Sequence, residues 1–163
     1  MKFYYQRHHR FVNKYKVGRV FKGSARLITD GSPALKETAM NLKEYFDTAK
    51  GLGVLSTADS DGQVGAAIYA RPHFMEDGTM AFVMRDRLSH HNLQSNPHAT
   101  YLFKEEGSGY RGKRLFMSKI KEEQNTELLE SLRRRKAVNG NAEDRFLVFF
   151  KLDKQLPLVG DGK

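Results

Sequence analysis

From Gly51 to Ile120 the chain alternates apolar and polar positions with the period of two that is typical of β-strands. Turn sequences separate these runs, as in Asp-Ser-Asp-Gly at residues 59–62 and Glu-Asp-Gly at residues 76–78. The pattern predicts six strands, at residues 52–58, 63–74, 79–85, 99–104, 114–122 and 145–152. Short runs of this kind, joined by tight connections, predict a small antiparallel β-barrel.

Helical periodicity occurs at three places beside these strands. Ser32 and Pro33 are typical of a helix N-cap and first helical position, and an apolar face follows at steps of three and four. That face consists of Leu35, Ala39, Leu42, Phe46 and Ala49. A short helix is predicted from an N-cap at Ser89 to Asn96 and Pro97. A third is predicted at residues 126–136, with Leu128, Leu129 and Leu132 facing inward. The predicted fold class is therefore mainly β with flanking helices.

The second predicted strand carries small residues on both of its faces. Val64, Ala66, Ile68 and Ala70 alternate with Gly65, Ala67, Tyr69 and Arg71. Side chains of this size leave room for a flat ligand to lie against the strand. In the third predicted strand, by contrast, Met80, Phe82 and Met84 form one large apolar face.

Charge is concentrated at the start of the chain. Residues 1–35 hold eight of the 28 Lys and Arg residues and one of the 19 Asp and Glu residues, so they carry +7 of the net charge of +9. Three interpretations compete for this arm: a nucleic-acid contact, a targeting leader, or an unstructured extension, even a translated region ahead of a true start at Met40. We favour the extension, which leaves residues 36–163 as one domain and makes nucleic acid an unexpected partner.

Cysteine is absent from the 163 residues. This excludes disulfides, thiolate metal sites and cysteine nucleophiles, and it favours a cytoplasmic location. The longest apolar run, residues 146–150, is far shorter than the roughly 20 residues that span a bilayer, so no membrane partner is expected. The adjacent His90 and His91 would point about 100° apart on a helix, so we expect no metal site.

Residues 107–112 match the G-x-G-x-x-G pattern of dinucleotide sites. In such sites a strand precedes the pattern and a helix follows it, so that the phosphates meet the helix N-terminus. Here a strand-like run follows instead. We therefore interpret this segment as a flexible hairpin connection.

The stretch from Arg85 to Leu93 leaves a strand and enters the short helix. Arg85, Arg87, the Ser89 hydroxyl and the N–H groups of the first helical turn could together bind a phosphate monoester. The same residues would also suit a capped surface helix with solvated arginines. Both interpretations stay open on these residues alone.

The order of the strands, the short helix and its ending in Leu93, Asn96 and Pro97 resembles the FMN-binding split barrel of the pyridoxamine 5'-phosphate oxidase-like family, over roughly residues 35–160. The resemblance implies a six-stranded antiparallel split barrel and a homodimer. It implies that FMN lies with its phosphate at the start of the short helix and its ring along the second strand. It also implies that the fifth strand or the partner subunit completes the pocket. The candidate cofactor-binding residues are Tyr69, Ala70, Arg71, Pro72, Met84, Arg85, Arg87, Ser89, His90, Lys113 and Arg114.

The chain departs from the family pattern at the phosphate ligands. Counted back from the Asn-Pro pair, the family's Arg-Lys pair falls on Leu88 and Ser89, and we expect Arg85, Arg87 and His90 to substitute. The function expected from the resemblance is that of an FMN-binding flavoprotein, an oxidoreductase acting on an unknown small-molecule redox substrate. The alternative is a non-catalytic split barrel that binds flavin or another phosphate-bearing ligand. No catalytic residue is assigned.

Overall fold

The computed structural model describes residues 33–124, 126–132 and 145–160. Within these ranges the helices are α1 (Pro33–Thr48), α2 (Leu88–Ser95) and α3 (Glu127–Leu132). The strands are β1 (Gly51–Ala58), β2 (Val64–Tyr69), β3 (His73–Phe74), β4 (Met80–Arg85), β5 (His98–Glu105), β6 (Gly112–Gln124) and β7 (Arg145–Pro157). Residues 1–32 of the predicted N-terminal extension, with the Ser32 cap, and the end of the third predicted helix lie outside the described residues.

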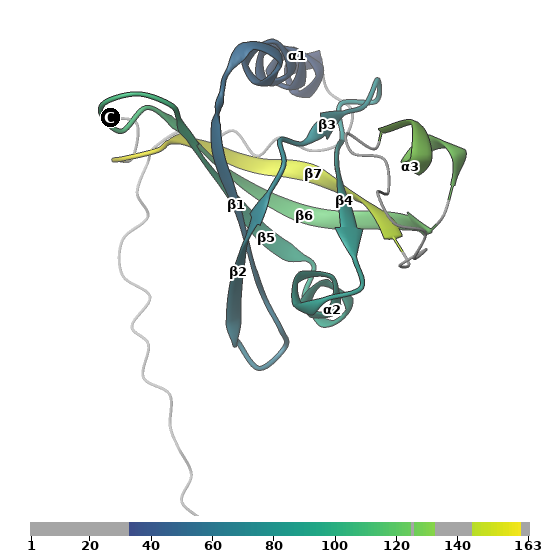
Figure 1. Cartoon of the computed structure of the whole chain (residues 1–163). Coiled ribbons are helices and arrows are strands. Elements are labelled where there is room, and N and C mark those ends of the chain that lie inside the picture. The colour runs from purple at the N-terminus through teal and green to yellow at the C-terminus, as the bar shows by residue number, and fades with distance from the viewer. Residues whose placement is uncertain (1–32, 125, 133–144, 161–163) are drawn as a thin grey trace, which may run out of the picture.

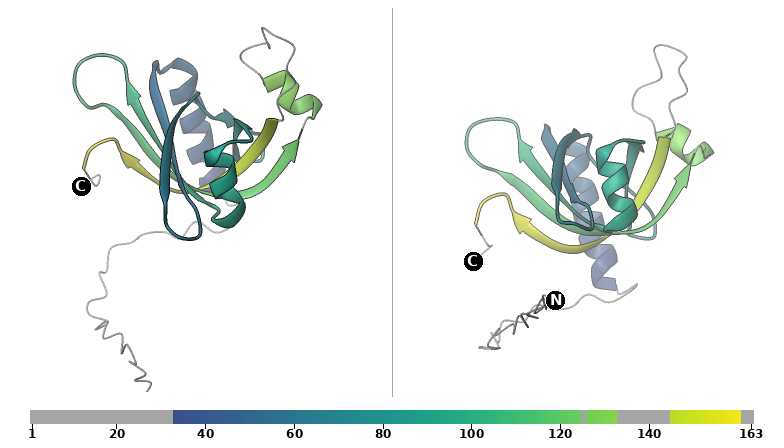
Figure 2. Two further views of the ribbon diagram at one scale, coloured as in Figure 1. Left: turned by 60° about the horizontal axis from the view of Figure 1, so that its bottom comes forward. Right: turned by 90° about the horizontal axis from the view of Figure 1, so that it is seen from below.

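The seven strands form one antiparallel sheet in the order β2-β1-β5-β6-β7-β4-β3. The sheet curls so that its two edges, β2 and β3 with β4, approach each other (Figure 1). α1 lies over one end of the curl and α2 over the other, as the rotated views also show (Figure 2). The predicted mainly β class and split-barrel architecture are confirmed.

One predicted strand, residues 63–74, is two strands in the structure, which is why seven are observed instead of six. β2 pairs with β1 at one edge of the sheet, whereas β3 pairs with β4 at the opposite edge. The chain crosses between the edges at residues 70–72. Pro72 cannot donate a backbone hydrogen bond, so it suits a break in the strand. This crossing closes the barrel across its split.

β6 and β7 extend beyond the predicted boundaries and pair along most of their length. Their register shifts between Phe116 and Met117 and again between Lys119 and Lys121. Such irregularities add twist and bend to a strand, which allows two 13-residue strands to follow the curl of the sheet. The predicted hairpin at residues 107–112 is confirmed, since it joins β5 directly to β6.

Large apolar side chains fill the inside of the curl. Phe82, Tyr101 and Phe150 are almost fully buried there, together with Met80 and Met84 from the predicted apolar face of β4. From α1, Phe46 packs against Phe74 and Phe103, and Leu42 is buried beside it. From α2, Leu93 closes the other end. The predicted apolar face of α1 is confirmed at Leu42 and Phe46.

A smaller cluster lies on the opposite side of β4 and β7, where α3 packs. Leu129 is fully buried there with Leu147 and Phe149. Leu128 was expected to face inward but is 41% exposed, because a six-residue helix turns only part of its surface toward the sheet. The first turn of α3 carries Glu127 and Glu130, whose negative charges suit the positive end of the helix dipole.

Replacing Gly53 by alanine should destabilise the barrel. A Cβ atom built on Gly53 would lie 1.9 Å from the hydroxyl oxygen of Tyr101, whose ring is fully buried. Overpacking of this kind costs about 1–3 kcal/mol. We expect Gly53→Ala to lower the free energy of unfolding by that amount in chemical denaturation, whereas Lys50→Ala, at an exposed position just before β1, should change it by less than about 0.5 kcal/mol. Equal stability of the two variants would contradict the packing described here.

Candidate functional site

A pocket of about 420 Å³ lies where the two edges of the curled sheet meet the start of α2. β2 and the residue after it supply one wall, β4 a second, and the beginning of α2 the third. The lining residues are Ala67, Ile68, Tyr69, Ala70, Val83, Arg85, Arg87, Leu88 and Ser89. The volume is within the range of roughly 300–1,000 Å³ found for small-molecule sites. Five of the predicted cofactor-binding residues are therefore brought together: Tyr69, Ala70, Arg85, Arg87 and Ser89.

α2 begins differently from the prediction at this pocket. Arg87, not Ser89, is the N-cap residue, in extended conformation and without a side-chain capping hydrogen bond. Ser89 is inside the first helical turn and is only 8% exposed. The predicted N-cap was wrong because the Ser89 hydroxyl bonds to Tyr69 from β2 and is not used to cap the helix. The first N–H groups of α2 therefore receive no capping hydrogen bond from the side chain of the N-cap residue.

Tyr69 connects the strand wall of the pocket to the helix wall. Burial raises the pKa of its hydroxyl above the ordinary value of 10.0, while the hydrogen bond with Ser89 and the charge of Arg87 act in the opposite direction. The phenol consequently stays protonated at neutral pH. A neutral hydroxyl in this position can donate one hydrogen bond and accept another.

Small and matched polar residues bring α2 close to the strands. A Cβ atom on Gly65 would lie 3.0 Å from the Leu88 side chain, so a glycine in β2 permits this approach. One turn after Leu88 in α2, the side chain of Asn92 donates a buried hydrogen bond of 3.1 Å to the hydroxyl of Thr57 in β1. These contacts fix the distance between the helix start and the strand wall of the pocket.

The break after β2 is held from inside the barrel. The Tyr101 hydroxyl donates to the carbonyl oxygen of Ala70 at 3.2 Å and lies 3.5 Å from that of Tyr69. Arg71 crosses to the C-terminal end of α1 and donates to the carbonyl oxygens of Phe46 and Ala49, the latter at 2.9 Å. Arg71 thus satisfies the last carbonyls of a helix and does not line the pocket.

The remaining predicted residues lie elsewhere in the fold. Pro72 is buried at the strand break, and Met84 is 1% exposed in the core. The Lys113 ammonium lies 4.6 Å from the centre of the Tyr45 ring, and Arg114 donates to the carbonyl oxygens of Pro157, at 2.9 Å, and Gly160. His90 is buried on the side of α2 that faces β6. None of these five lines the pocket.

Four lining residues were not among the sequence candidates: Ala67, Ile68, Val83 and Leu88. Ala67 and Ile68 directly precede the predicted Tyr69, so the run of small residues in this strand was the available signal. Leu88 was identified only as the position of a missing basic residue. Val83 gave no signal, because β4 faces β2 across the pocket only when the sheet has curled.

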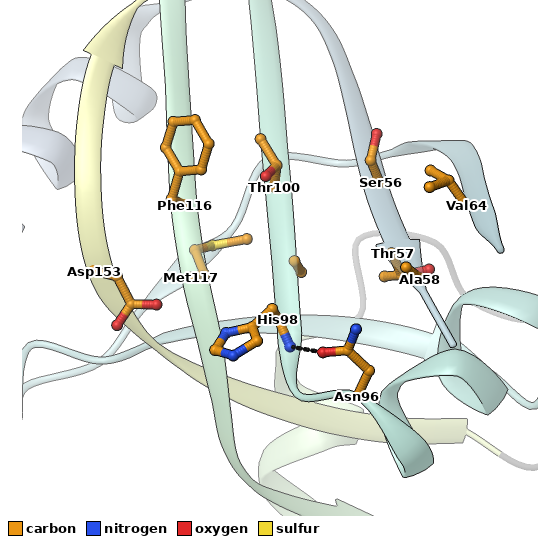
Figure 3. A pocket seen from close by; sticks show the side chains of 11 residues that line it. Ser56, Thr57, Ala58, Val64, Asn96, His98, Thr100, Phe116, Met117 and Asp153 are labelled. Atoms are coloured by element: carbon orange, nitrogen blue, oxygen red, sulfur yellow. Dashed lines mark hydrogen bonds between the residues drawn. The ribbon is translucent and has the colours of Figure 1, made fainter. Parts of the chain in front are cut away.

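A second pocket, of about 360 Å³, lies on the outer face of the sheet. Figure 3 shows Ser56, Thr100 and Phe116 side by side across β1, β5 and β6, with His98 and Asp153 at one end. Ser118 joins these two, since its hydroxyl donates to Asp153 at 2.6 Å and lies 3.1 Å from Nδ1 of His98. Side chains of strands form most of its lining.

The strand register gives the composition of this outer face. Ile68, Val54, Leu102 and Arg114 are directly paired across four neighbouring strands, and so are Ala66, Ser56, Thr100 and Phe116. We call these eight residues the outer face. One of the eight, Ile68, is a strongly exposed apolar side chain at 73%. Val64, next to the outer face on β2, is another at 74%.

Within the described ranges, no group of three or more His, Asp or Glu side chains is placed to hold a metal ion. Among the same residues, no helix has the length and apolar character needed to cross a membrane.

The sequence matches no model of a protein family and none of the curated proteins. Solved structures do share the fold. An FMN-binding protein from Syntrophomonas wolfei subsp. wolfei has 19% identity and a TM-score of 0.59, over 78% of this chain and 88% of that one. General Stress Protein 26 from Bacillus anthracis str. Sterne has 13% identity and a TM-score of 0.54, over 74% and 93%.

A putative pyridoxamine 5'-phosphate oxidase from Listeria innocua has 13% identity and a TM-score of 0.51, over 74% of this chain and 98% of that one. At such identities the likeness establishes the architecture. The resemblance inferred from the order of the elements is therefore confirmed as a resemblance of fold: the chain is a split barrel of the kind found in pyridoxamine 5'-phosphate oxidase-like proteins.

Proposed function

We propose that the protein binds FMN in the pocket between β2, β4 and α2 and acts as a flavin-dependent oxidoreductase. The observation that carries the proposal is the polarity of this pocket. Arg85, Arg87 and the uncapped start of α2 lie at one end, while Ala67 and Ala70 leave space along the strand at the other. A phosphate with a flat ring attached has the matching asymmetry.

The phosphate end suits a dianion. A helix N-terminus offers backbone N–H groups and the positive end of the helix dipole, and guanidinium groups form strong charge-assisted hydrogen bonds with phosphate oxygens. Ser89 adds a hydroxyl that is nearly buried. Together these groups replace the Arg-Lys pair of the family, whose positions hold Leu88 and Ser89 in this chain.

The ring end suits an aromatic system. Ala67, Ile68 and Ala70 present a shallow wall, and Val83 lies opposite on β4. The neutral Tyr69 hydroxyl, fixed by Ser89, can orient a polar edge of the ligand. FMN would supply the redox chemistry itself, and the protein would bind it, orient it and limit its contact with water.

We further propose that two copies associate through the outer face. Contiguous exposed apolar residues on a sheet mark interaction surfaces, and the face runs from Phe116 to Ile68, which also lines the pocket. A two-fold arrangement would bring this surface against itself. Arg114 of the second copy would then lie on the surface that borders the pocket. The flavin contact predicted for Arg114 would in this way come from the partner subunit, since Arg114 does not line the pocket of its own chain.

The experiment that tests the function is a titration of the full chain with FMN and with riboflavin, which differs by lacking the phosphate. We expect FMN to bind at least tenfold more tightly, because about 1.5–3 kcal/mol accompanies each charge-assisted hydrogen bond. Equal affinity for FMN and riboflavin would contradict the proposed phosphate site. Tight binding of FMN without any flavin-dependent turnover would favour the non-catalytic module instead. A cytoplasmic location remains a proposal that rests on the cysteine-free composition.

A further inference from the structure

His90, predicted as a phosphate ligand, is turned away from the pocket and enclosed between two carboxylates. Its Nδ1 lies 3.0 Å from Oδ1 of Asp86, and its Nε2 lies 3.2 Å from Oε2 of Glu122 on β6. The ring stacks on Phe146 of β7, with 3.9 Å between centroids and 19° between planes. Only 6% of the histidine side chain is exposed. Its orientation is therefore fixed from three sides.

The far side of this enclosure is rigidly supported. Lys119 binds Oε2 of Glu122 at 2.7 Å and also reaches the carbonyl oxygen of Leu93 at 3.3 Å. The Gln94 amide nitrogen donates to the same carboxylate oxygen at 3.2 Å and lies 3.0 Å from Nε2 of His90. Burial raises the pKa of Glu122, but the bonds from Lys119 and Gln94 and the nearby charges outweigh it, so the pKa is lowered and the carboxylate stays ionised. His90 is thus anchored to β6.

On the other side of His90 lies Asp86. This residue is between Arg85 and Arg87 in the sequence and directly precedes the N-cap of α2. Its side chain is 68% exposed, and its Oδ1 lies against Nδ1 of His90. A carboxylate at a helix start seeks the same N–H groups and positive charge as a phosphate does. Released from His90, Asp86 would be close enough to compete with the phosphate for these groups and to repel it.

We propose that His90 is a positioning residue that gives the pocket its preference for phosphate-bearing ligands, by holding the Asp86 carboxylate away from the start of α2. The inference rests on the proposed function and deepens it. The preference for FMN over riboflavin then depends on a residue that never touches either ligand. The signature is specific: losing His90 harms the binding of a phosphate-bearing ligand only while Asp86 is charged.

The test compares the dissociation constants of FMN and riboflavin across four variants, with thermal unfolding as a check on folding. His90→Leu keeps an apolar group against Phe146 but cannot bind Asp86. It should weaken FMN binding about five- to tenfold and riboflavin binding by less than about twofold, the scale expected for one charge near a helix start. His90→Leu with Asp86→Asn should recover wild-type FMN affinity within about twofold. His90→Gln, which can still donate to Asp86, should keep most of the preference.

The fourth variant, Asp86→Asn alone, keeps the inference falsifiable if His90→Leu does not fold. It should leave FMN affinity within about twofold of wild type, because His90 already holds this carboxylate aside. A tenfold loss there, an equal loss of both ligands in His90→Leu, or no recovery in the double variant would each overturn the inference. If the wild-type protein itself does not prefer FMN, the proposed function fails and takes the inference with it. If the wild type prefers FMN over riboflavin and His90→Leu keeps that preference, the inference is wrong but the proposed function stands.

Discussion

Replacing both Arg85 and Arg87 by alanine should weaken FMN binding about a hundredfold or more. Each guanidinium lines the phosphate end of the pocket, and each charge-assisted hydrogen bond contributes about 1.5–3 kcal/mol, so either single variant should lose about tenfold. Riboflavin affinity should change much less, because it has no phosphate. Fluorescence quenching of the flavin on binding provides the measurement.

A matched control is Lys151→Ala, which removes one positive charge from β7 at a side chain that is 61% exposed. It should leave FMN affinity unchanged within about twofold, since exposed charges remote from a site are screened by salt. If both arginine variants bind FMN as tightly as the wild type, the phosphate site has been misplaced. If the control loses as much as they do, the effect is one of net charge and not of the pocket.

Introducing glutamate at Phe116 should break the proposed dimer. Phe116 lies at the β6 end of the outer face, in line with Ser56 and Thr100 (Figure 3). In a two-fold contact the change would place a carboxylate of each copy against an apolar surface, and losing a buried aromatic anchor typically costs at least about 2 kcal/mol. We expect the dimer dissociation constant to rise at least about thirtyfold in analytical ultracentrifugation.

Leu128→Glu provides the comparison, since Leu128 is also an exposed apolar residue but is located on α3. That variant should leave the association state unchanged. A wild-type protein that is monomeric at all concentrations would contradict the proposed association. A Phe116→Glu variant that becomes monomeric yet retains full FMN affinity would show that one chain completes the pocket by itself.

Much of the fold was predictable because local signals and tertiary pairing agree. The Asp-Gly turn at residues 61 and 62, the alternation in β1 and the large apolar face of β4 all lie where the sequence indicates. The break between β2 and β3 was missed because alternation continues through residues 70–72. Pro72 was the local signal for a break there, and in the folded sheet the chain changes edges with the Tyr101 hydroxyl donating to the carbonyl oxygen of Ala70.

The site was predictable where residues adjacent in sequence are also adjacent in space. Arg85, Arg87 and Ser89 come together because a strand leads straight into a helix, which the sequence indicates. The orientation of His90 was not predictable, since its partner Glu122 is 32 residues away and β6 comes near α2 only in the folded barrel. The position of Arg71 was likewise not predictable, because its hydrogen bond to the carbonyl oxygen of Ala49, at the end of α1, joins segments that are distant in the sequence.

FMN binding is tested most directly by purifying the full chain, recording its visible absorption spectrum, and identifying by mass spectrometry any ligand released on denaturation. We expect a flavin spectrum, with FMN as the released ligand or as a ligand that apoprotein takes up stoichiometrically when it is added. Colourless protein that does not take up added FMN would contradict it. In that case Leu88 and Ser89, at the positions of the family's basic pair, would have removed flavin binding altogether.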